Sequence, residues 1–169
     1  MRKIILNLAI SLDSFIEDAN GAFDWCFTDQ DYGMTEFLDR IDTIFYGRKS
    51  YELILEMGDT TFADNRQYVF SNTLGTVEPG WDLINKDILN KVLEIRQQPG
   101  KDIWLFGGTS LVTTFIEAGL VDEYLLSIHP LLLGGGKPLF QNLSGRVPLE
   151  LVDTKSYSSG LVQLVYKKA

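Results

Sequence analysis

The sequence has little of what several kinds of functional site require. Its 169 residues contain one cysteine and one histidine, so an internal disulfide is impossible and a metal site would have to consist of carboxylates alone. We therefore expect no metal. A single cysteine also suits a reducing compartment, which predicts a cytoplasmic protein. No apolar run approaches the roughly 20 residues of a membrane-spanning helix, so no membrane partner is expected.

Basic residues are also few. Fifteen lysines and arginines stand against 23 aspartates and glutamates, which leaves a net charge of -8. Such a chain has no basic surface for a phosphate backbone, and we expect no nucleic-acid partner. The stretch from Met1 to Asp13 begins like a signal peptide, but it lacks a small-residue cleavage site and runs into acidic residues. We expect it to form the first strand.

No repeat, linker or change of composition divides the sequence, which predicts a single domain over residues 1–169. Short β-branched runs at 3–10, 43–46, 67–70 and 103–106 are each followed by a stretch with helical spacing. This alternation predicts an α/β fold with a mostly parallel central sheet flanked by helices.

Two helices and three further strands complete this prediction. Apolar faces predict one helix from Asp87 to Pro99, through Ile88, Leu89, Val92 and Leu93, and another from Thr109 or Ser110 to Gly119, through Leu111, Val112, Phe115 and Ile116. The last third contains expected strands at 123–128, 149–157 and 161–168, and residues 158–160 form a turn between the last two. We therefore expect an antiparallel C-terminal hairpin at one edge of the sheet.

Two junctions pass from a hydrophobic strand through glycine directly into a helix, at 45–51 and 105–110. Glycine lets a ligand approach the backbone, and the free N–H groups and dipole of a helix N-terminus favour an anion. Arg48, Lys49 and Ser50 add donors at the first junction. Either junction alone is equally a tight turn with exposed charges. Two in one domain favour a dinucleotide across the carboxyl edge of the sheet.

The common nucleotide fingerprints are missing. No Gly-x-Gly-x-x-Gly follows a strand and no Gly-x-x-x-x-Gly-Lys-Ser/Thr occurs, so neither a standard Rossmann domain nor a P-loop is expected. The run Gly134-Gly135-Gly136 before Lys137-Pro138 is interpreted as a structural turn. His129 is expected to be structural, and Cys26 has no nearby base that would make it a nucleophile.

The motifs occur in a recognisable order along nearly the whole chain. They are Ser11-Leu12-Asp13-Ser14-Phe15-Ile16, Tyr46-Gly47-Arg48-Lys49-Ser50-Tyr51-Glu52, Val69-Phe70-Ser71-Asn72-Thr73, Phe106-Gly107-Gly108, and Gly134 to Phe140. Together they resemble the dihydrofolate reductase superfamily, and more closely its branch with the reductase domain of the bifunctional riboflavin-biosynthesis deaminase/reductase. No zinc or deaminase signature is present, which indicates a stand-alone member.

This resemblance implies NADPH as the cofactor. The matching positions are Ala9 and Ile16 beside the nicotinamide, Gly47, Arg48, Lys49 and Ser50 at the pyrophosphate and 2′-phosphate, Ser71, Asn72 and Thr73 at the adenosine, and Phe106, Gly107, Gly108, Thr109, Ser110 and Leu111 at the other face of the pyrophosphate. The implied substrate contacts are Asn7, Asp13 and Trp25, although Trp25 is equally a cover for the core.

The resemblance also implies one acid early in the first helix. Asp31 is the catalytic candidate by spacing, and Asp29 or Glu36 are substitutes. A buried acid there is expected to have a raised pKa, while the alternative is that Asp31 only caps the helix. Val112 stands where folate-reducing enzymes usually carry a tyrosine, which weakens the folate assignment.

The expected function is hydride transfer from NADPH to a C=N or C=O group of a pteridine- or pyrimidine-like small molecule. One alternative is the riboflavin-pathway 5-amino-6-(5-phosphoribosylamino)uracil reductase, which would need a second basic cluster for the substrate phosphate. The other is a non-catalytic, NADPH-binding regulatory module. We also expect a homodimer, because the apolar residues Tyr124, Leu126, Ile128, Leu131, Leu132 and Leu133 exceed what a domain of this size readily buries.

Overall fold

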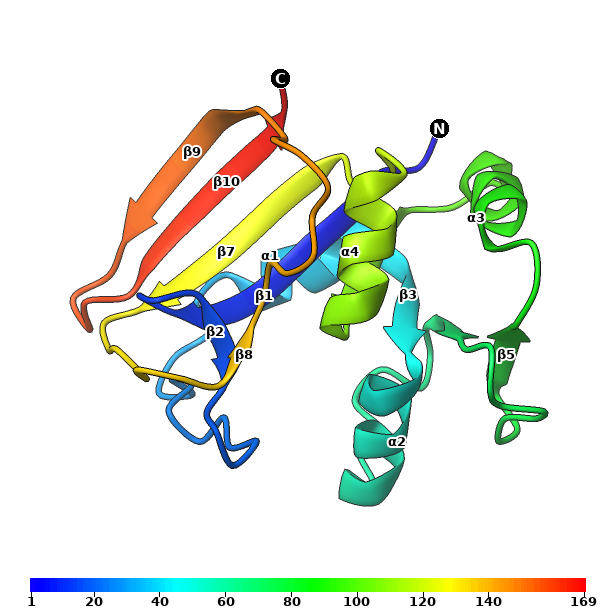
Figure 1. Cartoon of the computed structure of the whole chain (residues 1–169), viewed down its shortest axis with the longest axis horizontal. Coiled ribbons are helices and arrows are strands. Elements are labelled where there is room, and N and C mark those ends of the chain that lie inside the picture. Colours follow the sequence, from blue (N-terminus) through cyan, green and yellow to red (C-terminus); the bar gives the residue numbers. More distant parts are fainter.

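The computed structural model describes residues 1–169 and contains ten strands and four helices (Figure 1). The strands are β1 (Ile4–Ser11), β2 (Phe15–Glu17), β3 (Ile41–Gly47), β4 (Arg66–Phe70), β5 (Trp81–Ile84), β6 (Asp102–Gly107), β7 (Glu123–His129), β8 (Lys137–Pro138), β9 (Leu149–Ser156) and β10 (Val162–Lys168). The helices are α1 (Met34–Arg40), α2 (Arg48–Met57), α3 (Ile88–Gln97) and α4 (Thr109–Glu117). None of these helices is long and apolar enough to cross a lipid bilayer.

Eight strands form the central sheet in the order β5-β4-β3-β6-β1-β7-β10-β9. The pairs from β5 to β7 are parallel, while β10 runs antiparallel to both β7 and β9. The expected α/β fold with an antiparallel hairpin edge is therefore confirmed. The short strands β2, β5 and β8 were not predicted, because two to four residues carry too little periodicity to be recognised.

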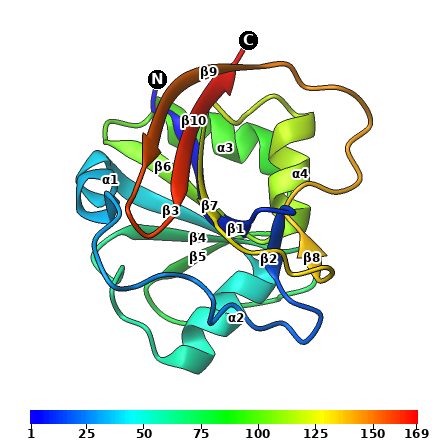
Figure 2. The same ribbon diagram turned by 90° about the vertical axis from the view of Figure 1, so that its left-hand side faces the viewer.

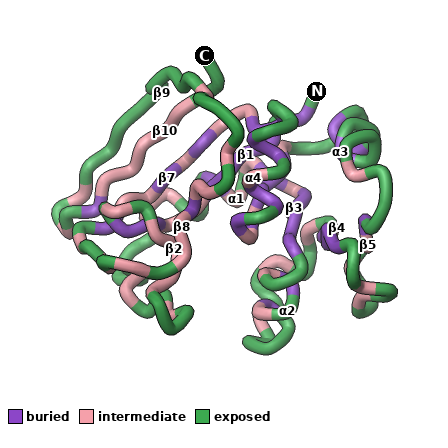
Figure 3. The backbone as a smooth tube through the Cα atoms, viewed as in Figure 1, coloured by how far each residue is buried: buried purple, intermediate pink, exposed green.

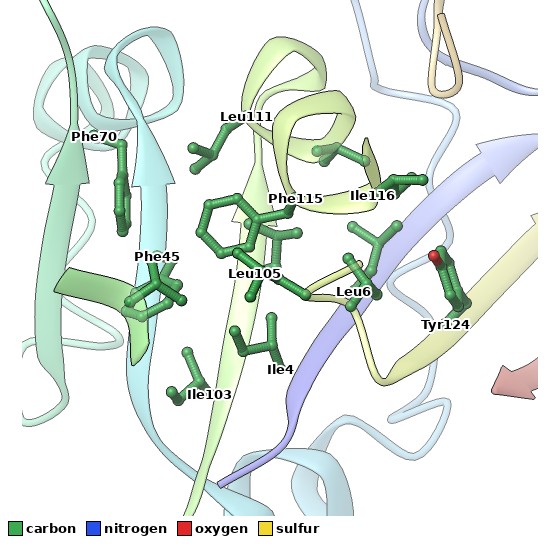
Figure 4. Close-up of a cluster of buried hydrophobic side chains, with 14 of the residues drawn as sticks. Ile4, Leu6, Phe45, Phe70, Ile103, Leu105, Leu111, Phe115, Ile116 and Tyr124 are labelled. Carbon is green, nitrogen blue, oxygen red and sulfur yellow. The ribbon is translucent and has the colours of Figure 1, made fainter. Parts of the chain in front are cut away.

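Each face of the sheet is covered by its own pair of helices, with α1 and α4 on opposite sides (Figure 2). Side chains alternate along β1, so Ile4 and Leu6 join one core cluster while Ile5 joins the other. The larger cluster packs α3 and α4 on the sheet, and Phe115 lies at its centre (Figure 4). The smaller cluster packs α1 and α2 through Phe37, Tyr51 and Ile54.

The two predicted helices bury different faces. In α4 all four predicted core residues are buried, as expected. In α3 the predicted face is partly wrong, since Leu89 and Leu93 are 48% and 40% exposed. Ile95 and Arg96 are buried instead. The Arg96 guanidinium donates to the Arg2 carbonyl and to Asp122, which satisfies a charge that the hydrophobic pattern excluded from the core.

The apolar surface expected near the terminal strands is also located differently. Tyr124 and Leu126 lie in the larger core cluster, so they do not form an exposed surface. Of the predicted residues, Leu132 is exposed, and further exposed apolar side chains lie on the edge strand β9, at Leu149, Leu151 and Val152. The strand β9 is exposed along its whole length (Figure 3). An unpaired, partly apolar edge of this kind is the natural place for another chain to pair.

Candidate active site

A cavity of about 800 Å³ opens on the face of the sheet that carries α1 and α2. Its floor consists of alternate residues on five neighbouring strands, β6, β1, β7, β10 and β9. Because side chains alternate along a strand, one residue in two from each of these strands faces the cavity. The volume suits a small molecule together with part of a dinucleotide.

The strand register arranges this floor in two rows. In the first, Asn7 lies opposite Leu125, which lies opposite Val165, which lies opposite Asp153. The second row contains Ala9, Ser127, Gln163 and Lys155 in the same order of strands. Neighbours in these rows, such as Asn7 and Leu125, lie far apart in the sequence.

One end of the cavity is formed by two helix N-termini. The helices α2 and α4 follow the adjacent strands β3 and β6, and their N-cap residues are Gly47 and Gly108. Neither cap makes a side-chain hydrogen bond, so the first-turn N–H groups are left for a ligand. A Cβ atom on Gly47 would lie 3.0 Å from the Gly108 nitrogen, which explains why glycine is needed where the two junctions meet.

The predicted cofactor residues are distributed around this end. Lys49, Ser50, Phe106, Gly107, Gly108 and Thr109 line the cavity, as do Ala9 and Ile16 further along. Lys49 makes no ion pair within the chain, whereas the exposed Arg48 lies outside the lining and pairs with Glu52 at 2.9 Å. Ser110 is exposed on α4 and Leu111 is packed in the core, so neither side chain faces the cavity.

Ser71, Asn72 and Thr73 lie beside the cavity. They follow β4, whose last residue pairs with Gly47, so they share an edge of the sheet with the two junctions. Ser71 is buried, and its hydroxyl oxygen accepts hydrogen bonds from the N–H groups of Thr73 and Leu74. Asn72 and Thr73 are exposed at this turn, which is available for a ligand that extends out of the cavity.

The other end of the cavity, which we call the substrate end, is lined by α1, by the segment before it and by β7, β10 and β9. Asn7 lies in the floor beside this end. Its residue is only 7% exposed, and no group of the chain is hydrogen-bonded to its side-chain amide. The polar atoms of this amide are therefore free to hydrogen-bond a ligand or a water in the cavity.

Asp31 lies at the rim of the substrate end and precedes α1. Its carboxylate accepts hydrogen bonds from the Thr35 N–H and hydroxyl at 2.9 and 2.8 Å, and from the Gly33 N–H at 3.1 Å. The hydrogen bonds from Thr35 dominate and lower the pKa of Asp31. The expectation of a raised pKa is therefore wrong, because the group is exposed and hydrogen-bonded rather than desolvated.

The other two predicted substrate residues do not line the cavity. Asp13 accepts hydrogen bonds from the Ser11 hydroxyl at 2.6 Å and from the N–H groups of Leu133 and Gly134. These bonds, the one from Ser11 above all, lower the pKa of Asp13, and they tie the 131–134 loop to β1. Trp25 packs edge-on against His129, with ring centroids 5.2 Å apart.

Several lining residues escaped the sequence analysis because they lie on the C-terminal strands. Gln163 is the clearest case. It donates to the Tyr32 carbonyl at 2.7 Å and to the Ser127 hydroxyl at 3.1 Å, and it accepts from the Tyr157 hydroxyl at 2.9 Å. The signal in the sequence is a glutamine between Leu161 and Val165, on the inward face of an otherwise apolar strand.

His129 supports the wall of the cavity. Its Nε2 atom accepts a hydrogen bond from the Phe27 N–H at 3.0 Å, so Nδ1 carries the proton and donates to the Ser127 carbonyl at 3.1 Å. Burial lowers the pKa of His129, which favours this neutral form. Burial also raises the pKa of Cys26 to about 11, which keeps the thiol protonated. Both side chains contact the wall, in agreement with a structural role for His129.

The glycine run after β7 is structural as well. Gly136 has a φ of +130°, and a Cβ atom there would lie 2.1 Å from the Glu17 carbonyl oxygen. This close approach lets β8 pair with β2 beside the cavity, where Lys137 lies 3.4 Å from Glu17. The interpretation as a structural turn is supported by this contact.

Comparisons with known proteins agree with this architecture. The family model of the RibD C-terminal domain matches residues 2–163. The uncharacterized protein YyaP of Bacillus subtilis strain 168 is 50% identical over 98% of this chain and 94% of its own length. A Shewanella sp. PV-4 protein named after riboflavin biosynthesis has a similar structure, with a TM-score of 0.89 and 24% identity over 100% of this chain and 99% of its own.

A second structure is more distant in sequence. The diaminohydroxyphosphoribosylaminopyrimidine deaminase/5-amino-6-(5-phosphoribosylamino)uracil reductase of Thermotoga maritima matches with a TM-score of 0.77 and 12% identity. The match covers 99% of this chain and 57% of the Thermotoga protein. At these identities both solved structures show that the fold is shared.

Proposed function

Because the chain belongs to the RibD C-terminal domain family, whose reductase-like fold it shares, we propose that it is an NADPH-dependent reductase. Its substrate in this proposal is a pteridine- or pyrimidine-like heterocycle, which accepts a hydride at a C=N or C=O bond. The observation that carries the proposal is the meeting of two glycine-capped helix N-termini at one end of a cavity. The reducing, cytoplasmic location expected from the cysteine content belongs to the same proposal.

The residues at this end fit a dinucleotide pyrophosphate. Two sets of first-turn N–H groups converge there, and the unpaired Lys49 ammonium supplies a positive charge. The hydroxyl of Ser50 adds a further donor. Backbone N–H groups together with one unpaired cation favour the charged pyrophosphate of a dinucleotide over an uncharged ligand.

The remaining lining residues position the reacting groups. NADPH, when bound, supplies the hydride. Ala9 is small enough to let a flat ring lie against β1, and Ile16 on β2 adds an apolar side chain to the lining. Phe37, Trp104 and Leu125 make the surrounding wall apolar and keep water away from the transfer. The chain therefore contributes orientation and exclusion of solvent.

The proton that accompanies the hydride has a limited set of sources. The floor at the substrate end carries amides and a hydroxyl from Asn7, Gln163 and Ser127. Asp31 is the candidate acid, but its lowered pKa leaves it ionised at neutral pH. In our proposal the Asp31 carboxylate accepts a hydrogen bond from a water at the rim, and this water relays a proton from bulk solvent to the substrate, so that no hydroxide remains beside the carboxylate.

A second candidate function is the riboflavin-pathway reduction of a ribosylaminopyrimidine phosphate. The observations that favour it are the family match and the Thermotoga protein, whose name includes this activity. This candidate requires a cationic site for the substrate phosphate, separate from that for the cofactor. Both reductase candidates differ from a third, a regulatory module that would bind NADPH without turnover.

A binding and turnover experiment tests the proposal. NADPH is titrated by calorimetry into the wild-type protein, a Lys49→Ala variant and a Lys86→Ala control, which removes an exposed lysine outside the cavity. We expect weaker binding only for Lys49→Ala. Oxidation of NADPH is then followed with dihydrofolate, dihydropterins and aminopyrimidines. Failure of NADPH to bind would refute the proposal, and tight binding without turnover would support the regulatory module.

A further inference from the structure

The charges at the substrate end are unevenly distributed. Three carboxylates, on Asp31, Glu36 and Asp153, line it, and none of them forms an ion pair. The two cations that line the same end are Arg40 and Lys155. The net charge that a ligand meets at this end therefore depends on whether these two cations are already paired within the chain.

Arg40 is already committed to other groups. Its guanidinium forms two hydrogen bonds with the Glu123 carboxylate, at 2.9 and 3.1 Å, and lies 3.7 Å from Asp102. This pairing raises the pKa of Arg40. The bidentate pair uses one N–H edge of the guanidinium, and the Glu123 carboxylate balances its charge, so Arg40 offers no uncompensated cation to a phosphate.

Lys155 is thus the one unpaired cation at this end, which is lined by three carboxylates without an ion pair. Its ammonium lies 4.9 Å from the centre of the Tyr157 ring, and its charge acts on the nearby Asp31. Lys49 is the other unpaired lysine of the cavity, but it follows β3, five strand spacings from β9. At about 4.8 Å per spacing that separation is roughly 24 Å, too far for both lysines to hold one phosphate.

The polar groups that β1, β7 and β10 contribute to the floor are uncharged. Asn7 is 7% exposed and lines the cavity, and its side-chain amide makes no hydrogen bond within the chain, so both its donor and its acceptor are free for a ligand. The Ser127 hydroxyl accepts from Gln163, which leaves its own O–H free to donate. A neutral ring with polar atoms at its edge matches these groups. A dianionic phosphate beside them would instead face uncompensated carboxylates.

We propose that the substrate end binds a nitrogen heterocycle without a phosphate group, hydrogen-bonded through a polar ring atom to the Asn7 amide. The inference deepens the proposed function and rests on it. It separates the two candidate reductases, because the riboflavin-pathway substrate carries a phosphate. The free anion sites of the cavity, at Lys49 and the two helix N-termini, are then used by the cofactor alone.

A matched pair of probes tests this inference. Uridine and uridine 5′-monophosphate share one heterocycle and differ in the phosphate. Each is titrated into labelled protein and followed by two-dimensional NMR, with and without saturating NADP⁺, which occupies the anion sites at the other end. The side-chain amide signals of Asn7 and Gln163 report on the substrate end. We expect both signals to respond to uridine at least as strongly as to the monophosphate.

Two variants make the charge argument specific. Asp153→Lys replaces a rim carboxylate by a cation and is expected to strengthen monophosphate binding about tenfold, with little change for uridine. Glu56→Lys makes the same change on an exposed residue outside the cavity and is expected to alter neither. Asn7→Ala should weaken both probes together.

Three results would overturn the inference. The first is that the wild-type protein binds uridine 5′-monophosphate more tightly than uridine. The second is that Asp153→Lys has the same ratio of affinities for the two probes as the wild type. The third is that the Asn7 amide signal responds to neither probe. Failure of the proposed function is a separate observation. It is read from the NADP⁺ titration at the Gly47 and Gly108 amides, which lie at the other end of the cavity.

Discussion

Replacement of Arg48 tests how the protein distinguishes the two nicotinamide cofactors. Arg48 is the first residue of α2 and directly follows Gly47, and we expect its guanidinium to bind the 2′-phosphate of NADPH. In the structure it pairs with Glu52, and both side chains are more than two-fifths exposed. An exposed pair of this kind contributes only about 0.3–0.5 kcal/mol, so the guanidinium leaves Glu52 for a phosphate at little cost.

The expected loss in Arg48→Ala follows from the bond that NADH cannot make. A charge-assisted hydrogen bond is worth roughly 1.5–3 kcal/mol, which corresponds to about tenfold to a hundredfold in affinity. We expect that loss for NADPH and much less for NADH, measured by calorimetric titration of each cofactor. The control Glu52→Gln releases Arg48 and should strengthen NADPH binding by about twofold. Equal losses for both cofactors would show that Arg48 serves the pyrophosphate or the fold.

Four further results are expected. Gly108→Val should fold, because a Cβ atom there meets only the Ser50 hydroxyl at 3.6 Å. Both cofactors should bind more weakly to it, because the side chain blocks the approach of a ligand to the backbone. Titrations in which only NADPH binding is lost would contradict this. If Asp31 donated the proton, Asp31→Asn would lower turnover by about 10²–10⁴. Because the pKa of Asp31 is lowered, we expect instead that the variant oxidises NADPH at a rate within severalfold of wild type and that α1 is slightly less stable. Burial holds the pKa of His129 below 6.5, so the unfolded state binds a proton more readily than the folded state does. The free energy of unfolding should therefore fall as the pH drops through about 6.5. Chemical denaturation of His129→Gln should lack this part of the pH dependence. Finally, light scattering at micromolar concentration should show a homodimer that Val152→Lys on the exposed β9 disrupts, whereas a monomeric wild type would count against pairing at this edge.

Local patterns in the sequence were enough for much of the fold. Strands β1, β3, β4 and β6 are short β-branched runs, and their alternation with helical spacing determines a parallel sheet because a crossover helix must separate parallel neighbours. The two glycine junctions were visible for the same reason, since glycine at a strand end before a helix is a local signal. That Gly47 and Gly108 approach each other follows from the adjacency of β3 and β6.

Charged and polar positions were harder to assign. For Asp31 the spacing left two alternatives, a buried acid or a helix cap. Burial is decided by what packs over a residue, and the exposed Asp31 instead accepts a hydrogen bond from the Thr35 N–H in the first turn of α1. Arg96 and Leu89 exchanged the roles that hydrophobicity assigned to them, because the Arg2 carbonyl and Asp122 satisfy the arginine inside the fold. Such partners are distant in sequence, so no local pattern shows them.

The sequence by itself determined the class of fold, the family and the two glycine junctions that meet at one end of the cavity, because these depend on periodicity and on motifs within a few residues. Only the tertiary structure decided the substrate end. There the register of β1, β7, β10 and β9 places Asn7, Ser127, Gln163 and Lys155 on one surface. Strand register is set by packing and hydrogen bonding between distant segments, and it therefore appears only once the chain is folded.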